Sequence, residues 1–339
     1  MSSNEYLIDI FNRHAVYINR LGTGEYKRVE KYINRAIKAA TDKLGEAKTE
    51  YQTIRYTDII RSLQIQLDQI FREMNDEWTV NLNRFAIYES EFTAKALDGA
   101  IAGNAAVNIP DTDLLVNAAL NKPLKLKSKQ LDINFVLREY SKGKQRMIID
   151  TIQEGLINGE TIEDLKSRLT GVSSLSKRQA RAVSRTVTNH VMTEARNQTF
   201  ENNKDIIDGF RVIATLDSKT SLICGAKDNQ VYDWSDPKPP FHYNCRSSIT
   251  PVIKDQYNKS IEGYRPAKGS DGKDKVGAYT NYGNWLKRQS AEYQKDVLGK
   301  TRYDLFREGK VEIEDFIDSN DNILSIEELM RREQLTLDF

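Results

Sequence analysis

The chain has 339 residues, 39% of them hydrophobic and 29% charged, which is enough for two or three domains with a substantial core. Fifty basic residues against 49 acidic ones leave a formal net charge of +1, so no overall charge draws the protein to nucleic acid. We find no apolar run of the roughly 18 residues that span a bilayer and no secretion signal, and two cysteines exclude a disulfide scaffold and fit a reducing cytoplasm.

Residues 1–105 predict a helical bundle, because they lack proline and their apolar residues follow helical spacing. A first helix is expected at about residues 26–44. Eight apolar residues of a second, long helix share one face: Ile60, Leu63, Leu67, Ile70, Met74, Trp78, Leu82 and Phe85. We interpret this stripe as ordinary core packing within an antiparallel bundle, and a coiled-coil partner is the alternative.

Residues 106–204 predict a linker followed by more helix. Glycine and proline between residues 99 and 131 indicate an irregular connection. Four lysines follow closely upon one another there: Lys122, Lys125, Lys127 and Lys129. Their partial alternation with leucine favours a solvated edge strand that resists self-pairing. A basic arm that contacts DNA or a partner is the alternative.

Two separate helices are expected in the rest of this region. Thr161 with Asp164 predicts the cap of a short helix that stops near Gly171, and the capping-box spacing of Ser176 and Gln179 predicts an amphipathic helix over residues 176–203. The buried face of this helix comprises Ala180, Val183, Val187 and Val191. A second stripe comprises four arginines: Arg178, Arg181, Arg185 and Arg196. We favour a solvated face for the arginines, with contact to phosphate or to an acidic partner as the alternative.

From residue 209 the period changes to that of a strand, in which Phe210, Val212 and Ala214 alternate with their neighbours. With short strands at Val231–Tyr232 and Ser247–Thr250, residues 205–255 predict a small antiparallel β knuckle. Residues 256–339 predict a loop near 263–277 and helices at about 284–298, 301–308 and 325–333. The expected fold class is α+β, mainly helical.

The knuckle holds the rarest residue types of the chain. Cys224, His242 and Cys245 include both cysteines and one of three histidines, and thiolate and imidazole are ligands that zinc prefers. A closed zinc site needs a fourth ligand, and Asp217 could supply it. We favour a metal-free knuckle without a cofactor, in which the thiols pack and His242 forms local hydrogen bonds. Zinc remains the alternative.

The remaining knuckle residues are interpreted as structural: Asp217, Pro239, Pro240, Asn244 and Arg246. The proline pair gives a stiff extended segment, Asn244 tolerates a turn, and Arg246 offers several donors to carbonyls or to a carboxylate. A nucleophile built from Cys224 and His242 would lack a third, orienting group. We therefore expect no catalytic residues, no enzymatic activity and no small-molecule substrate.

These motifs resemble the head-morphogenesis family of tailed phages, which includes the Mu F-like minor head proteins. The resemblance rests on the Asp217–Cys224 segment, the Pro-Pro-x-His-x-Asn-Cys-Arg run that ends at Arg246, and the Arg-Thr-rich helix around Arg185. Blocks such as Trp285–Gln289 and Ser325–Leu329 extend it over roughly residues 140–332. Many relatives carry further cysteines at the positions of Lys227 and Ser247.

The resemblance implies a minor structural protein of the virion head that takes part in head assembly in the host cytoplasm. The implied partners are the portal protein and other capsid proteins, without a membrane. A protein that binds the packaged DNA or is ejected with it is the second hypothesis. A metal-dependent hydrolase on the Cys/His knuckle is the third.

Overall fold

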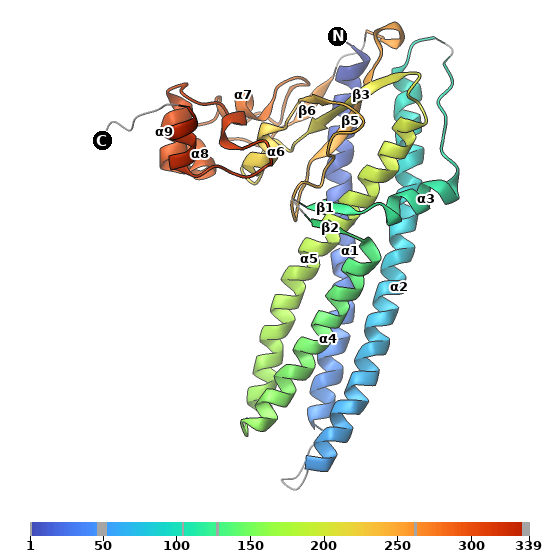
Figure 1. The fold of residues 1–339 in the computed structure, drawn as a ribbon, viewed down its shortest axis with the longest axis vertical. Helices are drawn as coiled ribbons and strands as arrows, with labels where there is room; N and C mark the ends of the chain where they lie inside the picture. The colour runs from blue at the N-terminus through green and yellow to red at the C-terminus, as the bar shows by residue number, and fades with distance from the viewer. Residues whose placement is uncertain (1, 46–52, 104, 127–128, 261–262, 334–339) are drawn as a thin grey trace.

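The structure is a computed structural model that describes residues 2–45, 53–103, 105–126, 129–260 and 263–333. Four long helices form a bundle: α1 (Ser3–Gly45), α2 (Thr53–Ala100), α4 (Ile133–Ile157) and α5 (Ile162–Glu201). Consecutive helices of the bundle run antiparallel, and the small sheet and the C-terminal elements gather at one end of it (Figure 1). The mainly helical α+β fold class is confirmed.

The apolar stripe of α2 packs inside the bundle. Six residues of the stripe are buried: Leu63, Leu67, Ile70, Met74, Trp78 and Leu82. The other two, Ile60 and Phe85, are partly buried and pack at the margin of the same cluster. Their neighbours come from α1, α4 and α5. The bundle therefore needs the helices beyond residue 105, and core packing accounts for the stripe.

Helix α5 is one continuous helix where we predicted two. The expected cap at its start is present, because Asp164 N donates to Thr161 Oγ1 at 3.1 Å and the Asp164 carboxylate accepts from Thr161 N. The predicted stop at Gly171 and the predicted start at Ser176 are wrong. Buried residues of α5 lie on both sides of the predicted break at residues 171–176, from Leu165 onward. Their packing outweighs the cost of about 1 kcal/mol for one glycine in a helix.

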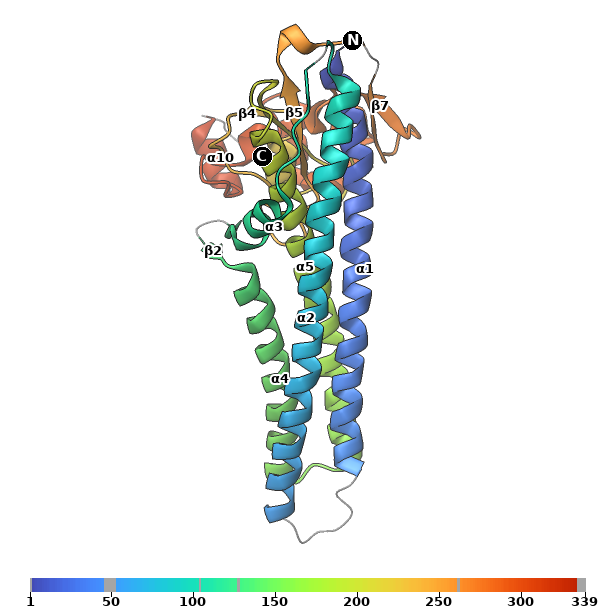
Figure 2. The ribbon, with the colours of Figure 1, turned by 90° about the vertical axis from the view of Figure 1, so that its right-hand side faces the viewer.

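The lysine-rich segment forms a hairpin rather than a single edge strand. Helix α3 (Thr112–Asn121), capped by the side chain of Asp111, packs on α2 and α5 above the start of α4 (Figure 2). Strands β1 (Leu124–Leu126) and β2 (Lys129–Leu131) follow and pair antiparallel.

The predicted three-stranded antiparallel sheet is confirmed. Strand β3 (Ile207–Ile213) lies between β4 (Val231–Tyr232) and β5 (Ser248–Ile253). Helix α6 (Leu222–Ala226) lies in the connection between β3 and β4. Since β5 contacts both α1 and α5, the sheet is fixed to the end of the bundle.

The C-terminal region contains four helices: α7 (Tyr282–Leu286), α8 (Ala291–Leu298), α9 (Lys300–Arg307) and α10 (Ile326–Arg332). The helices predicted at 301–308 and 325–333 are confirmed as α9 and α10, whereas the helix predicted at 284–298 is divided into α7 and α8 because Ser290 caps the start of α8. Two short 3-10 helices cover Asp255–Tyr257 and Glu314–Phe316. Trp285, Phe306 and Phe316 belong to the separate apolar cluster of this region. No helix among the described residues is both long and apolar enough to cross a membrane.

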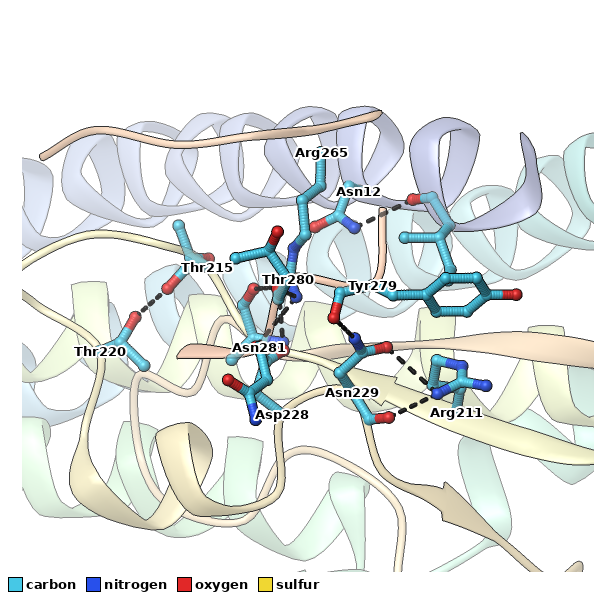
Figure 3. A network of polar contacts seen from close by, with 12 residues as sticks. Asn12, Arg211, Thr215, Thr220, Asp228, Asn229, Arg265, Tyr279, Thr280 and Asn281 are labelled. Atoms are coloured by element: carbon cyan, nitrogen blue, oxygen red, sulfur yellow. Dashed lines mark hydrogen bonds and ion pairs between the residues drawn. The ribbon is translucent and has the colours of Figure 1, made fainter. Parts of the chain in front are cut away.

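The predicted loop at 263–277 instead contains a hairpin of β6 (Tyr264–Pro266) and β7 (Lys275–Gly277). A buried ion pair explains why this polar segment is ordered. Both terminal nitrogens of Arg265 donate to the carboxylate of Asp228 at 2.9 Å, and one also donates to Thr280 O (Figure 3). Beside them, Asn229 Nδ2 donates to the backbone oxygen of Tyr279.

Candidate functional site

Two loops bring the three predicted zinc-ligand residues together. Cys224 lies on the short helix α6, while His242 and Cys245 lie in the segment before β5. Cys224 Sγ is 3.1 Å from His242 Nε2 and 3.6 Å from Cys245 Sγ, and the three donor atoms all lie within 4.8 Å of one another. Both cysteines are buried free thiols. The sequence prediction that these residues share one site therefore agrees with the geometry.

The hydrogen bonds of His242 determine which ring nitrogen faces the cysteines. His242 Nδ1 lies 2.8 Å from the carbonyl oxygen of Tyr243, which can only accept, so Nδ1 carries the proton. Nε2 then points toward the Cys224 sulfur and the Ser221 hydroxyl, 2.9 Å away, and in the neutral imidazole it carries a lone pair. An imidazole lone pair is thus directed at the thiols.

The two thiols differ in acidity. The hydrogen bond from Cys245 lowers the pKa of Cys224; burial opposes this, and hydrogen bonds from Ser221 and Ser247 act in the same direction as Cys245. Burial and the hydrogen bond to Cys224 raise the pKa of Cys245 well above its usual value.

Asp217 is occupied by Arg246 and does not join the cysteine cluster. Two guanidinium nitrogens of Arg246 donate to the two carboxylate oxygens of Asp217, each at 2.6 Å. Although burial raises the pKa of Asp217, the hydrogen bonds and charge of Arg246 hold it below its usual value. The expectation that Asp217 could be the fourth zinc ligand is wrong, because both of its oxygens are engaged in this ion pair.

The proline pair and Asn244 shape the segment that carries His242. Pro239 and Pro240 are buried and joined by a cis peptide bond. Asn244 has a φ of 63°, in the left-handed region that asparagine tolerates better than most residues. Its backbone N–H donates to Thr186 Oγ1 on α5 at 3.0 Å, so the turn is fixed directly to the bundle.

Asn189 of α5 is a site residue that our sequence reasoning missed. Its side-chain nitrogen donates to the backbone oxygens of Cys245 and Ser247, both at 3.1 Å. Thr186, Asn189 and Thr193 are all buried on α5 at helical spacing. This polar stripe is the signal that could have identified the helix face against which the knuckle packs.

The four arginines of the predicted stripe do not share one environment. Arg178 and Arg181 are exposed, and the guanidinium of Arg181 lies 4.7 Å from the ring centre of Tyr26. Arg185 is half-buried, and burial followed by the charge of Arg181 lowers its pKa. Arg196 is fully buried, so both the solvated face that we favoured and the alternative of contact with DNA or a partner are wrong for this residue.

Arg196 instead belongs to a buried ionic network between the bundle and the sheet. Arg196 Nε donates to Glu89 Oε1 at 2.6 Å, and the other oxygen of Glu89 lies 2.6 Å from His14 Nε2. Arg196 Nη1 also donates to the carbonyl oxygen of Ile249 at 2.8 Å. The network joins α1, α2, α5 and β5. Within it, the side chain of Arg196 stabilises the contact between the bundle and the sheet and is not available to bind a ligand.

The lysines at the hairpin also differ in their environments. Lys122 forms an ion pair with Glu194 of α5 at 2.7 Å, while Lys125 and Lys129 are exposed. Lys127 lies outside the described residues. The ion pair of Lys122 with Glu194 therefore partly neutralises the basic arm that was the alternative interpretation of these four lysines.

Comparison with known proteins agrees with the family resemblance expected from the sequence. Residues 146–250 match the family described as Phage Mu protein F like protein. The matched segment contains Asn189, Asp217 and the complete Cys224–His242–Cys245 cluster. It covers less than a third of the chain and is shorter than the residues 140–332 over which we saw related motifs. The comparisons with curated proteins and with solved structures gave no match.

Proposed function

We propose that this chain is a minor structural protein of a phage head that joins the assembling particle by binding the portal protein. The observation that carries the proposal is the match of residues 146–250 to the Mu F-like family. This segment is folded as one unit in the structure, because α5 holds the knuckle through Thr186, Asn189 and Arg196. The proposed role is structural, with no chemical step.

A DNA-binding or ejected virion protein is less well supported. It requires a basic face, but Arg196 is buried and Lys122 is paired with Glu194. Arg178 and Arg181 remain at the surface and could contact phosphate. A steep fall in DNA affinity with rising salt, abolished by the double substitution of Arg178 and Arg181 to glutamine, would favour this alternative.

Co-expression with the portal protein tests the proposal directly. We expect the two proteins to co-elute in size-exclusion chromatography, and we expect mass spectrometry to find the chain in virions and procapsids at far fewer copies than the major capsid protein. Separate elution at micromolar concentration, together with absence from virions and procapsids, would refute the proposal.

A further inference from the structure

We propose that Cys224, His242 and Cys245 bind a zinc ion whose fourth position, beside the Ser221 hydroxyl, is filled by water. The three side chains converge from two segments that are otherwise separated by strand β4. A bound ion would join α6 to the segment before β5. With three protein ligands and one water, the site has the open coordination that closed structural zinc sites lack, and its role here is to join these two segments.

The distance between the two sulfurs is close to that in a tetrahedral zinc site, and the sulfur–nitrogen distance is about 0.4 Å shorter than in such a site. Bonds of about 2.3 Å to sulfur and 2.0 Å to nitrogen, at tetrahedral angles, place two sulfurs about 3.8 Å apart and place sulfur and nitrogen about 3.5 Å apart. The two sulfurs are 3.6 Å apart, and Cys224 Sγ is 3.1 Å from His242 Nε2. A disulfide would require the sulfurs to approach to about 2.05 Å.

His242 is oriented in the way that metal-binding histidines are. Such histidines usually donate the second ring N–H to a carbonyl or carboxylate, which fixes the tautomer and directs the other nitrogen at the metal. Here Nδ1 donates to the carbonyl oxygen of Tyr243 and leaves Nε2 facing Cys224.

The protein supplies three ligands and leaves the fourth position to solvent. Asp217 is bound by Arg246 through both oxygens. The Ser221 hydroxyl lies 2.9 Å from His242 Nε2, but a neutral hydroxyl is a weak zinc ligand and this one also caps α6 by accepting from Cys224 N. His242 is only half-buried, so water and the ion can enter from its side.

The test is the metal content of the full-length protein, purified under reducing conditions without chelator. We expect about one equivalent of zinc, and X-ray absorption should show sulfur at about 2.3 Å and nitrogen or oxygen at about 2.0 Å. Replacement of the zinc by cobalt should give the sulfur-to-metal absorption of a thiolate site.

Two variants locate the ion. His242→Gln should lose zinc, and because His242 is at the edge of the cluster this variant keeps both buried thiols in place. The matched control is His190→Gln, since His190 lies outside the cluster and bonds to the backbone of Lys122; it should keep its zinc. Wild-type protein with two free thiols and negligible zinc, even after incubation with excess zinc, would overturn the proposal. A Cys224–Cys245 disulfide in the reduced preparation would overturn it as well.

Discussion

Arg246 holds both carboxylate oxygens of Asp217 at 2.6 Å and so closes a loop of the chain that contains Cys224 and His242. Both side chains are about four-fifths buried, and Arg246 lies next to Cys245 in the sequence. The ion pair therefore fixes the distance between the two segments that carry the candidate metal ligands.

Replacement of Arg246 by alanine should destabilise the protein. The substitution leaves the carboxylate of Asp217 partly buried without its main partner, which costs about 1–3 kcal/mol. We expect a lower free energy of unfolding in urea titrations and a parallel loss of incorporation into procapsids. Arg246→Lys should fall between wild type and alanine, because lysine keeps the charge but loses the two-pronged contact.

The control for Arg246 is Lys287→Ala, which removes an ion pair between more exposed side chains, Lys287 and Glu312. It should change the free energy of unfolding by less than about 1 kcal/mol. The outcome that contradicts our interpretation is an Arg246→Ala protein of wild-type stability that no longer joins procapsids. Arg246 would then contact a partner directly, as arginine often does at the centre of interfaces.

Much of the fold could be predicted from residue spacing. The stripe from Leu63 to Leu82 identified α2 because apolar spacing reports directly on which helix face is buried. The same method failed at Gly171 and Ser176, where local capping signals compete with packing along the whole of α5. A capping box shows where a helix can start, whereas tertiary contacts determine whether it does.

The site was only partly predictable for a related reason. Rare residue types drew attention to Cys224, His242 and Cys245, and the structure brings them together. Asn189 and Glu89 are common residue types whose roles depend on chain segments more than 50 positions away. Arg196 was misassigned because a helical projection shows which residues share a face but not what covers that face.

Asn189→Ala should detach the knuckle from α5 without unfolding the bundle. The substitution leaves the backbone oxygens of Cys245 and Ser247 without this donor, at about 1 kcal/mol or more for each lost hydrogen bond. Hydrogen exchange should accelerate at residues 241–248 while the amides in the middle of α2 stay protected. Equal acceleration in both regions would show that Asn189 stabilises the fold as a whole.

The Glu89–Arg196 pair should be among the most sensitive positions in the chain. Both side chains are fully buried, so Glu89→Gln leaves the charge of Arg196 without compensation, at a cost of about 3–5 kcal/mol. Arg72→Ala is the matched control on the same helix, because Arg72 pairs with Asp68 at the surface and should change the free energy of unfolding by about 0.5 kcal/mol or less. Similar urea midpoints for the two variants would mean that water reaches the Glu89–Arg196 pair and compensates the charge of Arg196.

Two glycines provide a paired test of how the C-terminal half meets the start of α1. A Cβ at Gly263 would lie 1.9 Å from the backbone oxygen of Glu5, a contact that only a shift of backbone could relieve, whereas a Cβ at Gly24 would meet no heavy atom within 4 Å. Close packing at Gly263 agrees with the nearby hydrogen bonds from Lys259 N to Ser3 Oγ and from Ile253 N to Asn4 Oδ1.

We expect the two alanine substitutions to have opposite signs. Gly263→Ala should lower the free energy of unfolding by about 1–3 kcal/mol, as overpacking does. Gly24→Ala lies within α1 and should raise it by up to about 1 kcal/mol, because alanine has the higher helix propensity. Both are measured by urea unfolding of the full-length protein. A Gly263→Ala protein as stable as wild type would mean that the segment at Gly263 does not pack against Glu5 as closely as the structure shows.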